Sequence, residues 1–186
     1  MNPESAGTFV RPAVAKDFEA IAAIYRPIVI DTAISFETEP PDTAEMRQRW
    51  QRLVAVGAPY LVAEDAGKVL GYAHVRPFHE RAAYAWTVEN SIFVAAHAQR
   101  RGVGRKLLGA LIAAAAGAGF RQMVALIAAD AAAGSLELHR AHGFTFAGRL
   151  TSVGHKHGRW HDVVYLQRAL GEGDVSAPGR IAAARR

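Results

Sequence analysis

Residues 88–105, VENSIFVAAHAQRRGVGR, place an acidic residue in an apolar strand and then a basic, glycine-containing loop. The mainly apolar segments at 85–88 before Glu89 and at 92–94 after it predict a strand over 85–94, and a helix is expected to begin near Gly104. A helix start collects free backbone N–H groups and the positive end of the helix dipole at one place. Gly102 and Gly104 have no Cβ, so a phosphate can come close to the main chain. The loop is therefore predicted to bind a pyrophosphate through Arg100, Arg101, Gly102, Val103, Gly104 and Arg105.

Hydrophobic periodicity predicts the other elements of an α/β (α+β) fold. One helix is expected after Asp17, which can serve as its N-cap. A second is expected after Asp42, where Asp42-Thr43-Ala44-Glu45 resembles a capping box, and a short helix is expected over 133–142. The second of these should bury a face of Met46, Trp50, Leu53 and Val54. Strands are expected at 8–11, 60–64, 69–75, 123–127, 144–149 and 160–167, with a polar loop over 76–83. This mixture predicts a mixed sheet with helices on both faces.

Length and composition indicate one folded domain. The chain has 186 residues, of which 51% are hydrophobic. The domain is expected to span 8–170, with flexible tails at 1–7 and 171–186. There is no cysteine, which excludes disulfides, thiolate metal sites and a cysteine nucleophile. The N-terminus lacks the pattern of a signal peptide, and the longest apolar stretch, 107–118, is too short to span a bilayer. A cytoplasmic protein with no membrane partner is expected.

The formal charge of +5 suggests an anionic partner, and four of the basic residues lie at 100–106. No aromatic residue interleaves with them, as a stacking platform for nucleic acid would require. A phosphorylated cofactor is the more economical interpretation, so no nucleic-acid partner is expected. His155, His157 and His161 are close in sequence, but no acidic residue has a recognisable metal-ligand spacing to them. No metal site is therefore predicted.

Four motifs together resemble a known family. QRRGVG at 99–104 resembles the acetyl-CoA loop Q/R-x-x-G-x-G/A of the GNAT N-acetyltransferase superfamily. WTVE at 86–89, LHRAHGF at 138–144 and GHKHGRWHDV at 154–163 resemble phosphinothricin N-acetyltransferases and the related methionine sulfone and sulfoximine acetyltransferases. The similarity covers roughly residues 8 to 170. It implies acetyl-CoA as cosubstrate and a homodimer. It also implies a twisted central sheet of about seven strands, splayed between the fourth and fifth strands at the cofactor cleft and flanked by about four helices.

Two residues are the candidates for proton transfer, which acetylation of an amine requires. Glu89 is the expected general base, because burial among apolar residues suits a carboxylate to that role and the resemblance puts the family's base there. Position alone would favour an outward-facing glutamate. His139 matches the place of the family's proton donor and is the second catalytic candidate. The alternative is an ordinary packed or solvated histidine.

The strand after Glu89 is expected to hold the cofactor through its backbone. The resemblance implies a bulge at Ile92, Phe93 and Val94 that offers main-chain groups to the thioester carbonyl and the pantetheine arm. Ordinary ladder pairing is the alternative. One departure is clear: Ala132 stands where relatives carry an asparagine that bonds pantetheine, unless Asp130 replaces it.

The acceptor pocket is assigned mainly by resemblance. Arg76-Pro77-Phe78 and Asn90-Ser91 match the family's substrate segments, and Arg76 suits the α-carboxylate of an amino acid. A solvated loop arginine is the alternative. Phe36 and Tyr84 are candidate pocket walls, although a lone Phe is more often core. The basic hairpin at 156–160 is expected to shape the substrate site or a dimer contact.

These residues predict an enzyme that transfers acetyl directly from acetyl-CoA to the free amino group of a small amino-acid analogue. Phosphinothricin, methionine sulfoximine and methionine sulfone are the acceptors that the resemblance implies. Alternatives are a GNAT enzyme that acts on polyamines or protein N-termini, and a non-catalytic CoA-binding module. An acidic pocket would favour the first, whereas Arg76 favours an acceptor with a carboxylate.

Overall fold

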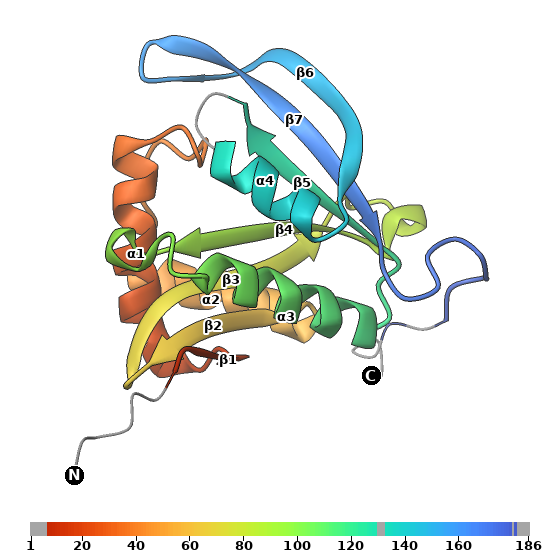
Figure 1. Ribbon diagram of the computed structural model, residues 1–186, viewed down its shortest axis with the longest axis horizontal. Coiled ribbons are helices and arrows are strands. Elements are labelled where there is room, and N and C mark those ends of the chain that lie inside the picture. Colours follow the sequence, from red (N-terminus) through yellow and green to blue (C-terminus); the bar gives the residue numbers. More distant parts are fainter. Residues whose placement is uncertain (1–6, 130–132, 180, 182–186) are drawn as a thin grey trace.

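The computed structural model describes residues 7–129, 133–179 and 181, which form one seven-stranded sheet and four α-helices. The helices are α1 (Phe18–Asp31), α2 (Thr43–Ala55), α3 (Val103–Gly117) and α4 (Ala133–Ala141). The strands are β1 (Phe9–Pro12), β2 (Tyr60–Asp65), β3 (Lys68–Pro77), β4 (Thr87–Val94), β5 (Gln122–Ala128), β6 (Thr145–Lys156) and β7 (Arg159–Ala169). The strand order is β1-β2-β3-β4-β5-β7-β6 (Figure 1). The predicted mixed sheet is confirmed.

The sheet splits between β4 and β5, its one parallel pair among the described strands. Pairing runs only from Thr87–Gln122 to Asn90–Ala125, and beyond that point the two strands diverge. Figure 1 shows them opening like a V from their shared end. On its other edge, β4 stays paired with β3 along its whole length, from Pro77–Val88 to Gly71–Val94. The splayed sheet that the resemblance implied is therefore confirmed, and the second half of β4 has one open edge.

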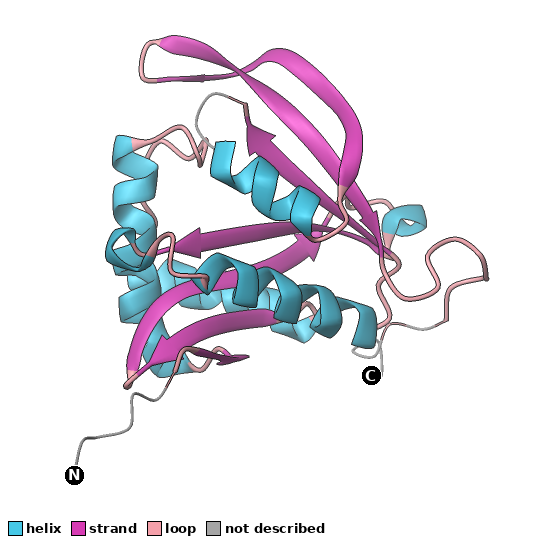
Figure 2. Cartoon of the chain, in the orientation of Figure 1, coloured by secondary structure: helices cyan, strands magenta, loops and turns pink. Residues whose placement is uncertain are grey.

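Helices cover the two faces of the first half of the sheet (Figure 2). Helix α3 packs against β2, β3 and β4 through Leu107, Leu108, Leu111 and Ala115, which are fully buried at helical spacing. Helix α1 contributes Phe18 and Ile21 to the core. Burying side chains of this size contributes about 1.5–3 kcal/mol each. This packing fixes α3 against β4, and so fixes where the loop before α3 lies.

Three local predictions are wrong in whole or in part. Arg76 and Pro77 lie in β3 rather than in a loop, because Arg76 is the cross-strand partner of Glu89 in the antiparallel β3–β4 pair. Asp17 is the N-cap residue of α1, as expected, but its side chain makes no capping hydrogen bond to that helix. Its carboxylate instead accepts bonds from the Val14 N–H at 2.8 Å and from Arg11 at 2.7 and 2.8 Å. In α2, Val54 is 48% exposed, because only part of that helix face meets the sheet.

The end of the sheet also differs from the prediction. Strands β6 and β7 form a longer hairpin than 144–149 and 160–167, with register shifts in β6 after Phe146 and after Leu150. These irregularities interrupt the alternation of polar and apolar residues, which hides the strand from a periodicity argument. The bulge expected at Ile92, Phe93 and Val94 does not appear in the β3–β4 register, which is continuous there.

The described part of the predicted C-terminal tail contacts the domain. The Arg121 guanidinium donates to Glu172 and Ser176, and the Trp86 indole N–H donates to the Gly179 carbonyl at 2.8 Å. Residues 1–6, 180 and 182–186 lie outside the described residues. In the part of the chain that is described, no helix is both long and apolar enough to cross a membrane.

Candidate active site

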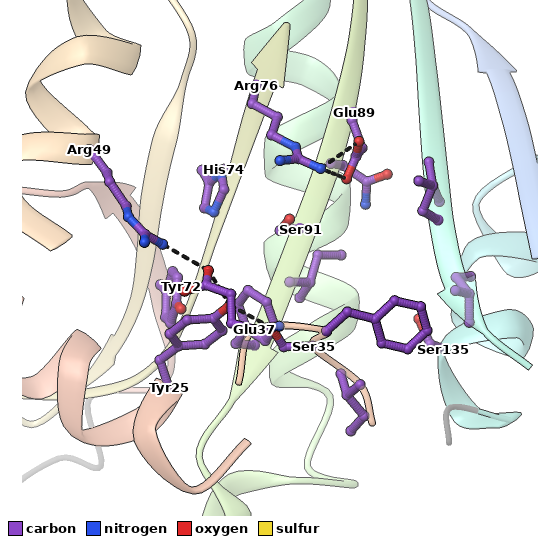
Figure 3. Close-up of a pocket in the computed structure, with 18 of the residues that line it drawn as sticks. Tyr25, Ser35, Glu37, Arg49, Tyr72, His74, Arg76, Glu89, Ser91 and Ser135 are labelled. Carbon is purple, nitrogen blue, oxygen red and sulfur yellow. Dashed lines mark hydrogen bonds and ion pairs between the residues drawn. The ribbon is translucent and has the colours of Figure 1, made fainter. Parts of the chain in front are cut away.

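A cavity of about 910 Å³ lies where β4 and β5 separate. Its walls come from α1, the α1–α2 connection, α2, the strands β2 to β5, α4 and β7. Figure 3 shows Arg76 and Glu89 at one end, a group of Tyr25, Ser35 and Glu37 at the other, and His74 between them. The cavity therefore carries opposite charges at one end and a hydrogen-bonded polar group at the other.

Glu89 and Arg76 form an ion pair inside this cavity. The Arg76 Nη2 atom donates to both carboxylate oxygens of Glu89, at 2.8 and 2.9 Å. The Glu89 side chain is 12% exposed and the Arg76 side chain is 56% exposed. The expected base is thus nearly enclosed, and the arginine that holds it faces solvent.

His139 is buried and bonded through both ring nitrogens. Its Nδ1 lies 2.7 Å from the Ser135 carbonyl oxygen, which can only accept, so Nδ1 carries the proton. Burial lowers the pKa of His139, which leaves Nε2 unprotonated, and Nε2 accepts from Asn90 Nδ2 at 2.8 Å. In this arrangement His139 has no proton to give from Nε2. It orients Asn90, whose buried Oδ1 lacks a partner among the described residues.

The opposite end of the cavity is a polar network that the sequence did not predict. The Tyr25 hydroxyl donates to Glu37 at 3.0 Å and lies 2.7 Å from Ser35 Oγ, and burial raises the pKa of Tyr25 to about 12. Arg49 donates to Glu37 at 2.7 Å (Figure 3). The tyrosine is therefore a stable neutral hydrogen-bonding group beside a neutralised carboxylate.

His74 lines the cavity two residues before Arg76 on the same face of β3. Its ring stacks on Tyr60 at 4.8 Å, and its Nδ1 is buried without a partner in the described part of the chain. Burial, and secondly the positive charge of Arg76, lowers its pKa to about 4. His74 is therefore neutral near pH 7. The alternation of Tyr72, His74 and Arg76 was the sequence signal that could have revealed this wall.

The β6–β7 hairpin closes the cavity from the far half of the sheet. The Lys156 ammonium is buried and donates to the carbonyl oxygens of Val29 and Ser35, each at 2.6 Å. Phe36, which lines the cavity, lies flat against Gly154: a Cβ there would be 2.1 Å from Phe36 Cε2. The hairpin thus holds the α1–α2 connection in place.

The predicted phosphate loop has the features of an anion site. Gly102 is the N-cap of α3 with φ 81, a conformation that favours glycine, and no side chain caps the helix. The first turn of α3 has no acidic residue. Arg100, Arg101 and Arg105 are exposed, and in the described residues none of them is in an ion pair. The free N–H groups of this turn and the three cations suit a pyrophosphate.

The loop is continuous with the cavity along β4. A Cβ on Gly104 would lie 3.4 Å from Leu138 of α4 and 3.8 Å from Val94, so the start of α3 adjoins the end of β4. Between Val94 and Glu89, β4 rises about 16 Å beside its open edge. An extended phosphorylated group can lie along this edge, with its phosphates at α3 and its other end at Glu89. The chain therefore fits a nucleotide-linked, elongated ligand such as acetyl-CoA.

The structure brings most of the predicted site residues together. Phe36, Arg76, Glu89, Asn90, Ser91, Ile92, Phe93 and His139 line the cavity. The cavity lining does not include Pro77, Phe78, Tyr84 or Val94. Phe78 instead packs on Tyr84, with ring centroids 5.8 Å apart. Asp130 and Ala132 lie outside the described residues, so the expected departure at the pantetheine contact stays a prediction. In the described residues, no group of three or more His, Asp or Glu side chains is arranged to hold a metal ion.

Comparison with known proteins gives a consistent result. The family model of the acetyltransferase (GNAT) domain matches residues 10–165. A phosphinothricin N-acetyltransferase of Alcaligenes faecalis is 46% identical over 162 residues, covering 87% of this chain and 82% of that protein. An L-methionine sulfoximine/L-methionine sulfone acetyltransferase of Salmonella typhimurium is 37% identical, covering 88% and 95%.

Solved structures agree with the sequence relatives. The crystal structure of a GNAT superfamily phosphinothricin acetyltransferase from Sinorhizobium meliloti, in complex with acetyl-CoA, superposes with a TM-score of 0.89. It is 41% identical, and the match covers 93% of this chain and 94% of that one. With its splayed sheet, its glycine loop before α3 and these relatives, this chain belongs to the GNAT acetyltransferase family.

Proposed function

We propose that this protein transfers the acetyl group of acetyl-CoA to the free amino group of a small amino-acid analogue. Phosphinothricin, methionine sulfoximine and methionine sulfone are the proposed acceptors, in agreement with the activities named for its relatives. We assign the reaction to a GNAT domain over residues 8–170. The proposed compartment is the cytoplasm, where acetyl-CoA is made and consumed.

One observation carries this proposal: Glu89 lies in the cavity on the same strand whose far end adjoins the phosphate loop. Arg100, Arg101, Gly102, Val103, Gly104 and Arg105 would hold the pyrophosphate, and the open edge of β4 would hold the arm that follows. When bound, acetyl-CoA supplies a thioester whose carbonyl carbon is open to attack by an amine.

The chain's own residues then provide what amine acetylation needs. Glu89 accepts a proton from the acceptor's ammonium group, directly or through a water, because only the neutral amine has a lone pair for attack. Main-chain groups at Ile92 and Val94 face the open side of β4, because successive residues of a strand point to opposite edges and β5 has diverged there. The Ile92 N–H is the proposed donor to the developing oxyanion. The splay of the sheet thus has the role that the bulge was expected to have.

His139 and Asn90 are proposed to act as a pair. Because His139 Nε2 accepts from Asn90, the histidine is better suited to hold the asparagine than to protonate the departing sulfur. Asn90 Oδ1 is then an available acceptor at the cavity wall. Ser91 and Phe36 complete the wall around the acceptor.

We also propose that the protein is a homodimer that pairs through the β6–β7 hairpin. Phe146 and Trp160 are 63% and 62% exposed on this hairpin, and Leu150 and Val153 are also exposed. Such an apolar group on an edge of the sheet suits a second copy of the chain. Light scattering of the purified protein, compared with a Trp160→Glu variant, tests this; a monomer in both cases would contradict it.

A turnover screen tests the function. The release of free CoA thiol is measured with acetyl-CoA and each of methionine sulfone, methionine sulfoximine, phosphinothricin, spermidine and a peptide with a free N-terminus. We expect turnover with the first three compounds. Turnover only with spermidine or the peptide would overturn the proposed acceptor class, and acetyl-CoA binding without any turnover would support a non-catalytic module.

A further inference from the structure

The ion pair between Arg76 and Glu89 has a consequence for which acceptors can react. The two residues are direct cross-strand partners, so their side chains leave the same face of the sheet and reach each other without rearrangement of the backbone. Arg76 donates to both oxygens of Glu89. Proton transfer to Glu89 in this state would break a charge-assisted pair, which opposes the base function of that carboxylate.

The two partners differ in accessibility. Arg76 is 56% exposed, and in the described part of the chain only its Nη2 atom has a partner, which leaves Nε and Nη1 for a ligand. Glu89 is 12% exposed. A ligand that enters the cavity therefore meets the cation first, and the carboxylate becomes available only as the pair opens.

We propose that an α-amino acid inserts its two charges between Arg76 and Glu89, so that the acceptor itself frees the base. The acceptor's carboxylate replaces Glu89 as the partner of Arg76, and its ammonium group replaces Arg76 as the partner of Glu89. One carboxylate–guanidinium pair is replaced by two pairs, a carboxylate with the Arg76 guanidinium and an ammonium group with the Glu89 carboxylate. Opening the original pair therefore has little net cost in free energy. This inference rests on the proposed function and deepens it, because it makes the acceptor's carboxylate a requirement for reaction as well as for binding.

The transfer that follows forms one carbon–nitrogen bond and breaks one carbon–sulfur bond. The acceptor nitrogen passes one proton to Glu89 and forms a bond to the acetyl carbon with its lone pair. The carbon–sulfur bond breaks with its electrons on sulfur, which takes up a proton. The second proton on nitrogen and the proton on Glu89 leave to solvent or to sulfur, so that one acetamide, one thiol and one proton result.

A neutral acceptor behaves differently. The amide of an amino acid has the amine but not the anion, so it offers Arg76 nothing in exchange for Glu89. A ligand shifts a two-state equilibrium only through its different affinity for the two states. In the presence of the amide, the pair therefore stays closed and the base stays held. It follows that Arg76 suppresses the reaction of acceptors that lack a carboxylate.

The test compares methionine sulfone with its primary amide on the wild type and on Arg76→Met, which keeps the bulk of the side chain without the charge. We expect kcat/KM for the acid to fall at least tenfold in the variant. For the amide we expect kcat/KM to rise about threefold or more, because Glu89 is released. For each ligand, kcat/KM of the variant is compared with kcat/KM of the wild type. The acid is not compared directly with the amide, because the amine of the amide is less basic.

The matched control is Arg149→Met. Arg149 is 55% exposed and forms an ion pair with Asp162 on the β6–β7 hairpin, outside the cavity. We expect this substitution to leave kcat/KM unchanged for both the acid and the amide. Arg76→Lys should restore part of the preference for the acid, since it restores a cation. Calorimetry without acetyl-CoA gives a second measurement: the acid should bind at least tenfold more weakly to Arg76→Met, and the amide should bind no more weakly.

The possible outcomes are distinct. An amide that reacts equally or more slowly with Arg76→Met than with the wild type would overturn the inference, because a residue that only binds the acid leaves the amide unaffected. In that case acetylation of methionine sulfone by the wild type would still uphold the proposed function. If the wild type acetylates no amino-acid analogue, the proposed function fails, and weaker binding of the acid to Arg76→Met on calorimetry would then show only that Arg76 holds its carboxylate.

Discussion

At the scale of the residue, the proposed base function depends on how Glu89 is enclosed. Val88 before it is fully buried, its own side chain is 12% exposed and the oppositely charged Arg76 lies across the β3–β4 pair. The acidic residue was evident from the sequence because apolar residues stand before it and, from Ile92, after it in the same strand. Its partner was missed, because Arg76-Pro77 at the start of a polar stretch is typical of a loop.

Replacement of Glu89 by Gln keeps the shape of the side chain and removes its basicity. We expect kcat/KM for methionine sulfone to fall about a hundredfold or more, while the affinity for acetyl-CoA is unchanged on calorimetry. The exposed Glu80, replaced by Gln, is the control and should be neutral. Near wild-type rates for Glu89→Gln from pH 6 to 9 would contradict the role of general base.

At the scale of the element, the start of α3 is the proposed binding site for the phosphates of acetyl-CoA. Gly104 lies in its first turn, where a Cβ would meet Leu138 at an ordinary contact distance of 3.4 Å. The branched side chain of Gly104→Val would additionally cover the N–H groups of that turn. We expect acetyl-CoA to bind at least tenfold more weakly, about 1.4 kcal/mol, on calorimetry.

Gly117→Val is the matched control, because it puts the same side chain in the last turn of α3, where no atom lies within 4 Å of a Cβ. Its affinity for acetyl-CoA should equal that of the wild type. If a folded Gly104→Val variant also binds acetyl-CoA normally, the phosphate site lies elsewhere.

The β6–β7 hairpin acts at the same scale by holding the cavity wall. In Gly154→Ala, the added methyl group would stand 2.1 Å from the Phe36 ring, and the ring has to move because Lys156 fixes the strand nearby. We expect KM for the acceptor to rise about tenfold with an unchanged affinity for acetyl-CoA.

Gly148→Ala on the same strand is the control, because its methyl group would meet no atom within 4 Å. The double variant Gly154→Ala with Phe36→Ala tests the cause, since removing the ring removes the clash and the two effects should not add. Additive effects, or a normal KM in Gly154→Ala, would show that this contact does not shape the acceptor site.

At the scale of the whole molecule, burial of neutral histidines makes stability depend on pH. The pKa of His74 is about 4 in the folded chain and near 6.5 when the chain is unfolded. As pH falls below about 6.5, the unfolded state gains a proton that the folded state does not take up, so the free energy of unfolding decreases. This contribution is complete above the unfolded pKa and is lost progressively toward pH 4.

We expect His74→Phe to lose less stability than the wild type between pH 7 and pH 5, by on the order of 1–2 kcal/mol. Urea unfolding followed at both pH values measures the difference. His97→Phe, which changes an exposed histidine, should keep the wild-type dependence. If the free energy of unfolding changes equally with pH in His74→Phe and in the wild type, then the pKa of His74 is the same in the folded and unfolded chain, which would contradict the prediction.

The sequence by itself determined the features that depend on neighbouring residues. A strand, a basic glycine loop and an apolar-faced helix follow one another over residues 85–117, so strand β4, the phosphate loop and α3 could all be predicted. Capping of α2 by Asp42 was also predictable, because the Glu45 N–H it accepts from, at 2.7 Å, is only three residues away. Local hydrogen bonding and side-chain periodicity depend on residues only a few positions apart, so both can be predicted from the sequence.

Only the tertiary structure decided which side chains meet Glu89 and its neighbours in the cavity. The pair with Arg76 spans 13 positions, the bond between Asn90 and His139 spans 49 and the bond from Lys156 to Ser35 spans 121. Such contacts depend on sheet register and on where β4 and β5 part. A one-residue change in register would turn every side chain of a strand to the opposite face, so no local pattern can specify them.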